Sequence, residues 1–147
     1  MLLRLFASTT LFMASLAAFS QTTTLKEENE ARSTADNIVR FVAEGSWKKG
    51  WDLIRSVSVI PENELNVAEA QIVGEMEKIA TRFGTVTGQE FLVSEKVGAR
   101  LIRYQYLVHY QKAPIRWMLV FYQGKAGWVL TDFKFDANYG VLFPRGV

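Results

Sequence analysis

The change of hydrophobic period at Gly84 constrains the fold of this chain more than any other feature. Before Gly84 the apolar residues recur at helical spacing, and after it they alternate with polar residues as they do in β-strands. The expected strands span residues 90–96, 100–111, 115–122 and 128–135, and the short, turn-rich breaks between them indicate antiparallel hairpins. N-terminal helices packed on a curved antiparallel sheet of about four strands predict an α+β fold, a cone-shaped roll.

Three helices are expected before Gly84. Thr24 and Glu27 have the spacing of a capping box for the first helix. Ser46 is the expected N-cap of the second, and Asn66 with Glu69 resembles the cap of the third. The apolar stripe expected on the third helix contains Val73, Met76, Ile79, Ala80 and Phe83.

The predicted core combines the helix stripes with one face of the sheet. It contains Ile38, Val42, Trp51, Ile54, Ile79, Phe83, Ile102, Tyr104, Tyr106, Val108, Trp117, Leu119 and Phe121. The opposite face should be partly solvated, because it mixes Leu101, Leu107, Met118 and Val120 with Arg103, Gln105, His109 and Arg116. The last strand is ambiguous, since its apolar residues fall on even positions at 128–130 and on odd positions at 133–135.

The first twenty residues predict a secretory signal peptide. Arg4 is their only charge, an apolar run follows it, and Ala18 and Ser20 are small residues at the positions that a signal peptidase reads. An uncleaved anchor is the alternative, although the run is short for a membrane span of about 20 residues. Residues 21–33 are expected as a polar lead-in or the start of the first helix, and residues 34–147 as a single domain. Export without any cysteine favours a bacterial periplasm, with no stable membrane insertion after cleavage.

Composition and motifs exclude several classes of function. Lys and Arg number 17 against 15 Asp and Glu, and this net charge of +2 excludes a strongly basic nucleic-acid binder. With no cysteine and one histidine, His109, the chain has no thiol nucleophile, iron–sulfur cluster or His-rich zinc site. It contains no dinucleotide-binding, phosphate-binding, zinc-protease or calcium motif. We therefore expect no cofactor and no metal, and the sequence leans against an enzyme.

The order of the elements resembles a known superfamily. A first helix ends in EGSWKKGW at residues 44–51, a third runs into RFGTV at 82–86, and the last strand opens with GWVL at 127–130. Over residues 34–135 this resembles the nuclear-transport-factor-2-like superfamily, the cystatin-like α+β cone, and most of all its small exported bacterial domains of unknown function. The resemblance implies a conical cavity and frequent dimerisation through the outer sheet face. Its enzymes place an Asp/His pair or an Asp/Tyr set in the cone, which this chain does not match residue by residue.

Two features could carry chemistry in such a cone. Tyr104, Tyr106 and Tyr110 share a strand face near Trp117, where their hydroxyls could hydrogen-bond a ligand or could simply belong to packed core rings. Asp132 interrupts an apolar strand and could act as a general base beside Tyr104. If Asp132 instead lies on the outer face it is a solvated charge, and the sequence favours this interpretation because Phe133 and Phe135 make the better inner pair.

A third feature lies in the second helix, where Lys48 and Lys49 stand between Trp47 and Trp51. This cluster could touch membrane headgroups or an anionic partner. Two lysines are few for electrostatic binding, so the favoured interpretation is that the tryptophans pack the helix onto the sheet.

Three hypotheses about function follow. The first is a non-catalytic periplasmic binding module whose aromatic cone holds a small apolar ligand through Tyr104, Tyr106, Tyr110 and Trp117. The second is an isomerase- or hydrolase-like enzyme that uses Asp132 and Tyr104. The third is a structural or dimerisation domain of an envelope assembly with a filled cone. A homodimer through the outer sheet face is expected, unless residues 138–147 cover that face in the same chain.

Overall fold

Three helices precede a four-stranded antiparallel sheet in the computed structural model, which describes residues 22–143. The helices are α1 (Glu28–Ala43), α2 (Trp47–Val57) and α3 (Glu62–Phe83). The strands are β1 (Val86–Val97), β2 (Leu101–Tyr110), β3 (Pro114–Gln123) and β4 (Trp128–Asp136), and a short 3-10 helix, η1 (Tyr139–Leu142), follows them. The predicted α+β fold is confirmed. The predicted signal peptide, residues 1–20, lies outside the described residues.

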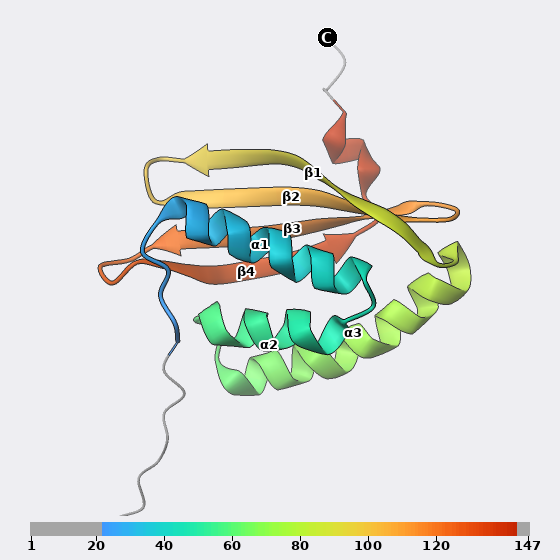
Figure 1. Ribbon diagram of the computed structural model, residues 1–147, viewed down its shortest axis with the longest axis horizontal. Coiled ribbons are helices and arrows are strands. Elements are labelled where there is room, and N and C mark those ends of the chain that lie inside the picture. Colours follow the sequence, from blue (N-terminus) through green and yellow to red (C-terminus); the bar gives the residue numbers. More distant parts are fainter. Residues whose placement is uncertain (1–21, 144–147) are drawn as a thin grey trace, which may run out of the picture.

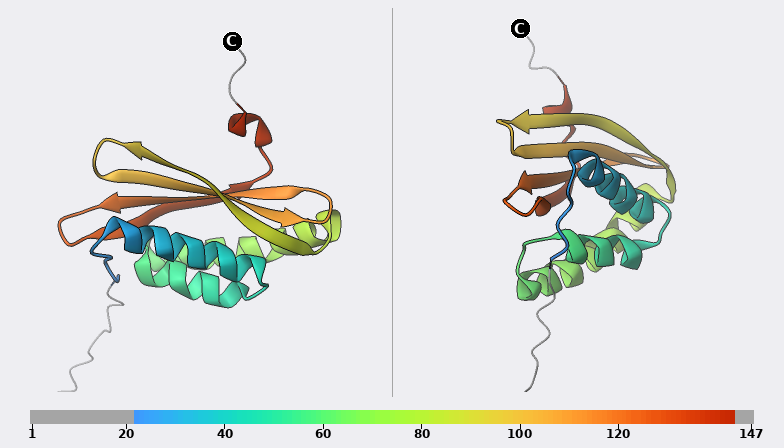
Figure 2. Two further views of the ribbon diagram at one scale, coloured as in Figure 1. Left: turned by 45° about the horizontal axis from the view of Figure 1, so that its top comes forward. Right: turned by 60° about the vertical axis from the view of Figure 1, so that its left-hand side comes forward.

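The sheet is a curved, open meander in the order β1-β2-β3-β4 (Figure 1). The three helices lie on one side of it, and η1 lies on the other (Figure 2). We call the side toward the helices the inner face and the other side the outer face. Each strand pairs with the next along the chain through a hairpin, so side chains two residues apart fall on the same face.

The N-terminus of α1 differs from the prediction. Its capping box is formed by Glu27 and Glu30, three residues after Thr24 and Glu27. Glu30 accepts the backbone N–H of Lys26 at 2.6 Å and that of Glu27 at 3.3 Å. The later box is used because Leu25 exchanges backbone hydrogen bonds with Trp128, so the chain at residue 25 is paired with β4 and cannot belong to the helix.

The start of α3 differs as well. The helix begins at Glu62, directly after Pro61, rather than at the predicted cap of Asn66 and Glu69. Those two side chains serve another purpose, because Arg55 of α2 donates to Asn66 Oδ1 at 2.8 Å and to Glu69 Oε2 at 2.5 Å. The residues that looked like a cap therefore tie α3 to α2.

The predicted core is confirmed for all but two of its residues. Ile79 and Phe83 of α3 are only half-buried, whereas the rest of the predicted set is buried. Val73 and Ala80 are exposed, so their places in the predicted apolar stripe are wrong. The cause is the position of α3, which lies beside α2 (Figure 2). Of its residues, Leu65 and Ile72 are the ones that are buried in the core.

A β-bulge resolves the ambiguity in β4. Asp132 lies opposite Val120 and Leu130 opposite Phe121, so Thr131 is an extra residue between two register positions. The bulge reverses the alternation, and the apolar residues on both sides of it reach the inner face: Trp128, Leu130, Phe133 and Phe135.

The segment before α1 closes one end of the β4 edge. Leu25 N donates to the Trp128 carbonyl oxygen at 2.9 Å, and Trp128 N donates to the Leu25 carbonyl oxygen at 2.6 Å. Gly127 has φ of 143°, and a Cβ at this position would overlap the Leu25 carbonyl. This close backbone approach requires glycine.

Candidate functional site

The predicted ligand-binding residues lie on the inner face and are packed into the core. Tyr104 and Tyr106 are each 2% exposed, Trp117 is fully buried and Tyr110 is half-buried. Trp117 stacks on Phe135 of β4 with 5.0 Å between ring centroids. The structure therefore brings the four predicted residues together. Tyr104, Tyr106 and Trp117 are packed against other side chains of the core, which leaves no open space beside them for a ligand in the described part of the chain.

The tyrosine hydroxyls find partners within the chain. Tyr106 donates to Asp36 Oδ1 at 2.7 Å and Tyr104 to the Glu28 carbonyl oxygen at 3.4 Å. Burial raises the pKa of Tyr104 to about 12, and it also raises the pKa values of Tyr106 and Tyr110. These phenols therefore stay protonated at neutral pH and act as hydrogen-bond donors rather than as bases.

Two buried indole groups are exceptions to this pairing. Trp51 Nε1 and Trp117 Nε1 have no hydrogen-bond partner in the described part of the chain. Both side chains are fully buried, and Trp51 packs edge-on against Phe133 at 5.5 Å. A ligand that accepted from these N–H groups would have to displace packed rings.

The structure does not bring Asp132 and Tyr104 together. Tyr104 faces the helices, whereas Asp132 is exposed on the outer face of β4, beside Lys134 along the strand. The sheet itself separates the two side chains, which removes the geometric basis for their acting on one substrate. Asp132 lies where the outer-face alternative placed it.

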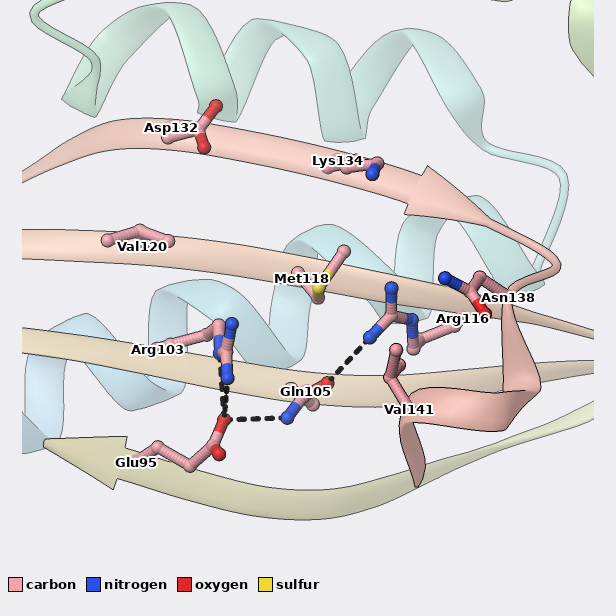
Figure 3. Close-up of a pocket in the computed structure, with 10 residues that line it drawn as sticks. All are labelled: Glu95, Arg103, Gln105, Arg116, Met118, Val120, Asp132, Lys134, Asn138 and Val141. Atoms are coloured by element: carbon pink, nitrogen blue, oxygen red, sulfur yellow. Dashed lines mark hydrogen bonds and ion pairs between the residues drawn. The ribbon is translucent and has the colours of Figure 1, made fainter. Parts of the chain in front are cut away.

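A connected polar network crosses all four strands on the outer face, and Figure 3 shows its part on β1, β2 and β3. Glu95 of β1 accepts from Arg103 Nε at 2.7 Å and from Gln105 Nε2 at 2.6 Å, both of β2. Gln105 Oε1 then accepts from Arg116 Nη1 of β3 at 3.3 Å. Arg116 also donates to both carboxylate oxygens of Asp136 in β4, at 3.0 and 2.8 Å. The antiparallel register places these five side chains on one face.

The middle of this network is buried although it lies on the outer face. Arg116 is 5% exposed and Gln105 is 6% exposed. Part of the cover is η1, because the Tyr139 hydroxyl donates to the Pro114 carbonyl oxygen at 2.6 Å and Val141 lines the same pocket as Arg116. The described part of the predicted covering segment, residues 138–143, thus covers one end of the outer face, and residues 144–147 lie outside the described residues.

The pKa of Asp136 is shifted by its contacts in the network. Its hydrogen bonds to the Arg116 guanidinium lower the pKa of Asp136 to about 2, with smaller contributions from the Asn138 N–H and the Lys134 ammonium group. The carboxylate is therefore fully ionised at neutral pH and serves as an anchor for Arg116.

A pocket of about 530 Å³ lies over the network. Met118, Val120 and Val141 supply its apolar lining, and its charged lining contains Glu95, Arg103, Arg116, Asp132 and Lys134. Among the described residues, Asp132 has no ion pair. The lining thus carries three basic and two acidic side chains and is mixed in polarity.

Exposed apolar residues continue this surface toward the β1–β2 hairpin. Val93 is 39% exposed, Val97 72%, Leu101 37% and Tyr122 42%. By the strand register, Val97, Leu101 and Tyr122 form one row across the outer face. Apolar surface that adjoins polar groups in this way often marks an interface.

The sequence prediction missed Glu95 and Asp136 as members of the network. Asp136 continues the alternation Asp132, Lys134, Asp136 along one face of β4, and the antiparallel hairpin sets it opposite Arg116. This period-2 pattern was the available signal, but the predicted strand ended one residue too early.

The other candidates behave as surface or packing residues. His109 lies on the outer face with Nε2 3.2 Å from Glu90 Oε2. Trp47 packs on Trp51 at 5.5 Å. Within residues 22–143, no group of three or more His, Asp or Glu side chains could hold a metal ion, and no helix is long and apolar enough to span a membrane.

The chain matches no protein-family model, no curated protein and no solved structure. The resemblance to the nuclear-transport-factor-2-like superfamily therefore stays a prediction from sequence, and function has to be argued from the surfaces described above.

Proposed function

We propose that this chain is a non-catalytic interaction domain whose outer sheet face binds a second copy of the chain. The observation that carries the proposal is the organised outer face, where a fixed polar network lies beside an exposed apolar row. Arginine, tyrosine, methionine and aliphatic side chains are typical of the centre of protein interfaces. Together with the predicted export signal, this favours a dimerisation domain of an envelope assembly.

The outer face is also complementary to itself. Two sheets that pack face to face by a two-fold rotation share an axis in the plane of the interface. An axis at right angles to the strands, passing between the Val120 and Met118 positions, would set Asp132 opposite Lys134 of the partner subunit. The same axis would set Leu101 toward the partner's Leu107, at the end of the face where the partner's η1 lies. Opposite charges and apolar groups would thus meet their complements.

A cone that holds a small apolar ligand is less favoured, although it remains a prediction. Its expected residues are packed against protein, and two of the tyrosine hydroxyls are hydrogen-bonded within the chain. Binding there would require the core to open, whereas association through the outer face requires no rearrangement of the inner face.

The experiment is light scattering on the mature protein across micromolar concentrations, where twice the monomer mass is expected. The variant Val93→Lys/Leu101→Lys places two charges on the outer face and should give the monomer mass. Its matched control is Val67→Lys/Val73→Lys on α3, where the valines are 58% and 43% exposed, and it should stay dimeric. A monomeric wild type, or a dimer that survives the first variant with an unchanged circular dichroism spectrum, overturns the proposal.

Charge reversal tests the predicted register of the dimer. Asp132→Lys would set two lysines against each other across the interface and should weaken dimerisation at low salt. Adding Lys134→Glu to that variant restores opposite charges and should restore the dimer. A second substitution that weakens the dimer further would show that these two positions do not face one another.

A further inference from the structure

We propose that a second surface, the groove between α3 and the ends of β3 and β4, binds a small amphipathic carboxylate. The groove has a volume of about 320 Å³, at the lower end of the range for small-molecule sites. Its lining comes from the C-terminal half of α3, the start of β3 and the end of β4. These parts of the chain lie at one end of the sheet (Figure 1). The outer-face interface is a different surface, so this inference does not rest on dimerisation.

The groove has an apolar lining. Ile79 and Phe83 of α3 form one side and are half-buried, as is Phe135 on the opposite side. Ile115 of β3 is 2% exposed. All four lie on the inner side of the fold, and α3 leaves Ile79, Phe83 and Phe135 partly open because it buries mainly Leu65 and Ile72. An apolar chain could therefore lie along this lining without opening the core.

The rim of the groove offers one cation to a ligand. Its two acids are already engaged, because Glu75 Oε1 is 2.7 Å from Lys78 Nζ and Asp136 is held by Arg116 through both oxygens. Among the described residues, Arg82 forms no ion pair, and its guanidinium lies 5.0 Å from the centre of the Phe83 ring. A guanidinium presents paired N–H donors that match a carboxylate.

An apolar lining beside one guanidinium selects ligands by two properties. The lining favours an aliphatic or aromatic body of a few carbon atoms, and Arg82 favours a single negative headgroup. Octanoate, octanol and octylammonium share one chain and differ in headgroup charge, so they separate the two contributions. Octanoate should bind at least about tenfold more tightly than octanol, since a charge-assisted hydrogen bond to Arg82 distinguishes them. Octylammonium should bind most weakly.

Titration calorimetry on the mature protein tests this with two variants and a matched control for each, all at exposed positions. Arg82→Gln should weaken octanoate binding about tenfold, to the level of octanol. Its control Arg100→Gln, in the β1–β2 turn, should leave octanoate binding unchanged. Ala137→Phe, which puts a ring into the groove, should abolish binding, whereas Ala126→Phe in the β3–β4 turn should not.

Three outcomes would overturn the inference. The first is equal affinity of the wild type for octanoate and octanol, or no saturable binding of octanoate. The second is an Arg82→Gln protein that binds octanoate as the wild type does. The third is an Ala137→Phe protein that keeps its native circular dichroism spectrum and still binds octanoate. Each of them leaves the dimer test unaffected, because that test reads molecular mass.

Discussion

Replacement of Asp136 by asparagine should destabilise the fold, because it leaves the buried Arg116 guanidinium without its carboxylate partner. The Arg116 side chain is 7% exposed and that of Asp136 is 18% exposed, and both carboxylate oxygens accept from the guanidinium. Lowering the pKa of Asp136 from 3.8 to about 2 corresponds to about 2 kcal/mol of stability at neutral pH. Removing one member of a buried ion pair costs about 3–5 kcal/mol. Because asparagine keeps one acceptor oxygen, we expect a loss nearer about 2 kcal/mol.

The lowered pKa of Asp136 also predicts how the stability difference changes with pH. The pKa of Asp136 is lower in the folded protein than in the unfolded chain, so its ionised form stabilises the fold above about pH 4. That contribution is lost as the pH falls from about 4 toward 2. The difference in unfolding free energy between wild type and Asp136→Asn should therefore have its full value at pH 7 and should decrease as the pH falls from about 4 toward 2.

Urea denaturation at fixed low protein concentration measures both effects. The matched control is Asp52→Asn, because Asp52 forms an exposed i,i+4 pair with Lys48 and pairs of that kind contribute about 0.3–0.5 kcal/mol. The reasoning fails if the two variants lose equal stability at pH 7. It also fails if the Asp136→Asn deficit is the same at pH 2 as at pH 7.

Three further predictions concern the core, the β3–β4 turn and export. Trp117→Ala should cost on the order of 3–5 kcal/mol in urea denaturation, as large aromatic truncations in cores do; an unchanged midpoint would show that the ring is not packed. Gly127→Ala should destabilise the fold by about 1–3 kcal/mol because of its positive φ, whereas Gly124→Ala should be nearly neutral. Expressed with residues 1–20 in a bacterium, the chain should appear in the periplasmic fraction with Gln21 at its N-terminus by mass spectrometry, and a retained segment would contradict this.

The elements that could be predicted are those specified by local pattern. The existence of the four strands and the faces of β2 and β3 follow from alternation, and Ser46 directly precedes α2 as expected. The start of β1 does not, because the strand begins at Val86 rather than at residue 90. The start of α3 could not be found in this way, because Asn66 and Glu69 have the chemistry of a cap but are bound by Arg55 of another helix. A competition between a local cap and a contact across two helices cannot be decided from spacing alone.

The half-burial of α3 was missed for a related reason. A stripe with Met76, Ile79 and Phe83 predicts a helix that buries one face, but it does not say whether that face meets the sheet or a neighbouring helix. In the structure the core part of α3 is Leu65 and Ile72, and the C-terminal half forms a wall of the groove instead.

The outer-face network depends on one extra residue in β4. Without the bulge at Thr131, strict alternation from Leu130 would point Asp132 and Asp136 toward the helices and Phe133 outward. Arg116 would then lose its carboxylate partner, and the core would gain charged groups. The Thr131 hydroxyl donates to the Val120 carbonyl oxygen at 3.1 Å, which gives the bulged segment a local hydrogen bond. The same residue that made the sequence ambiguous thus assembles the filled inner face and the charged outer face together, so a change that removes the bulge should damage both.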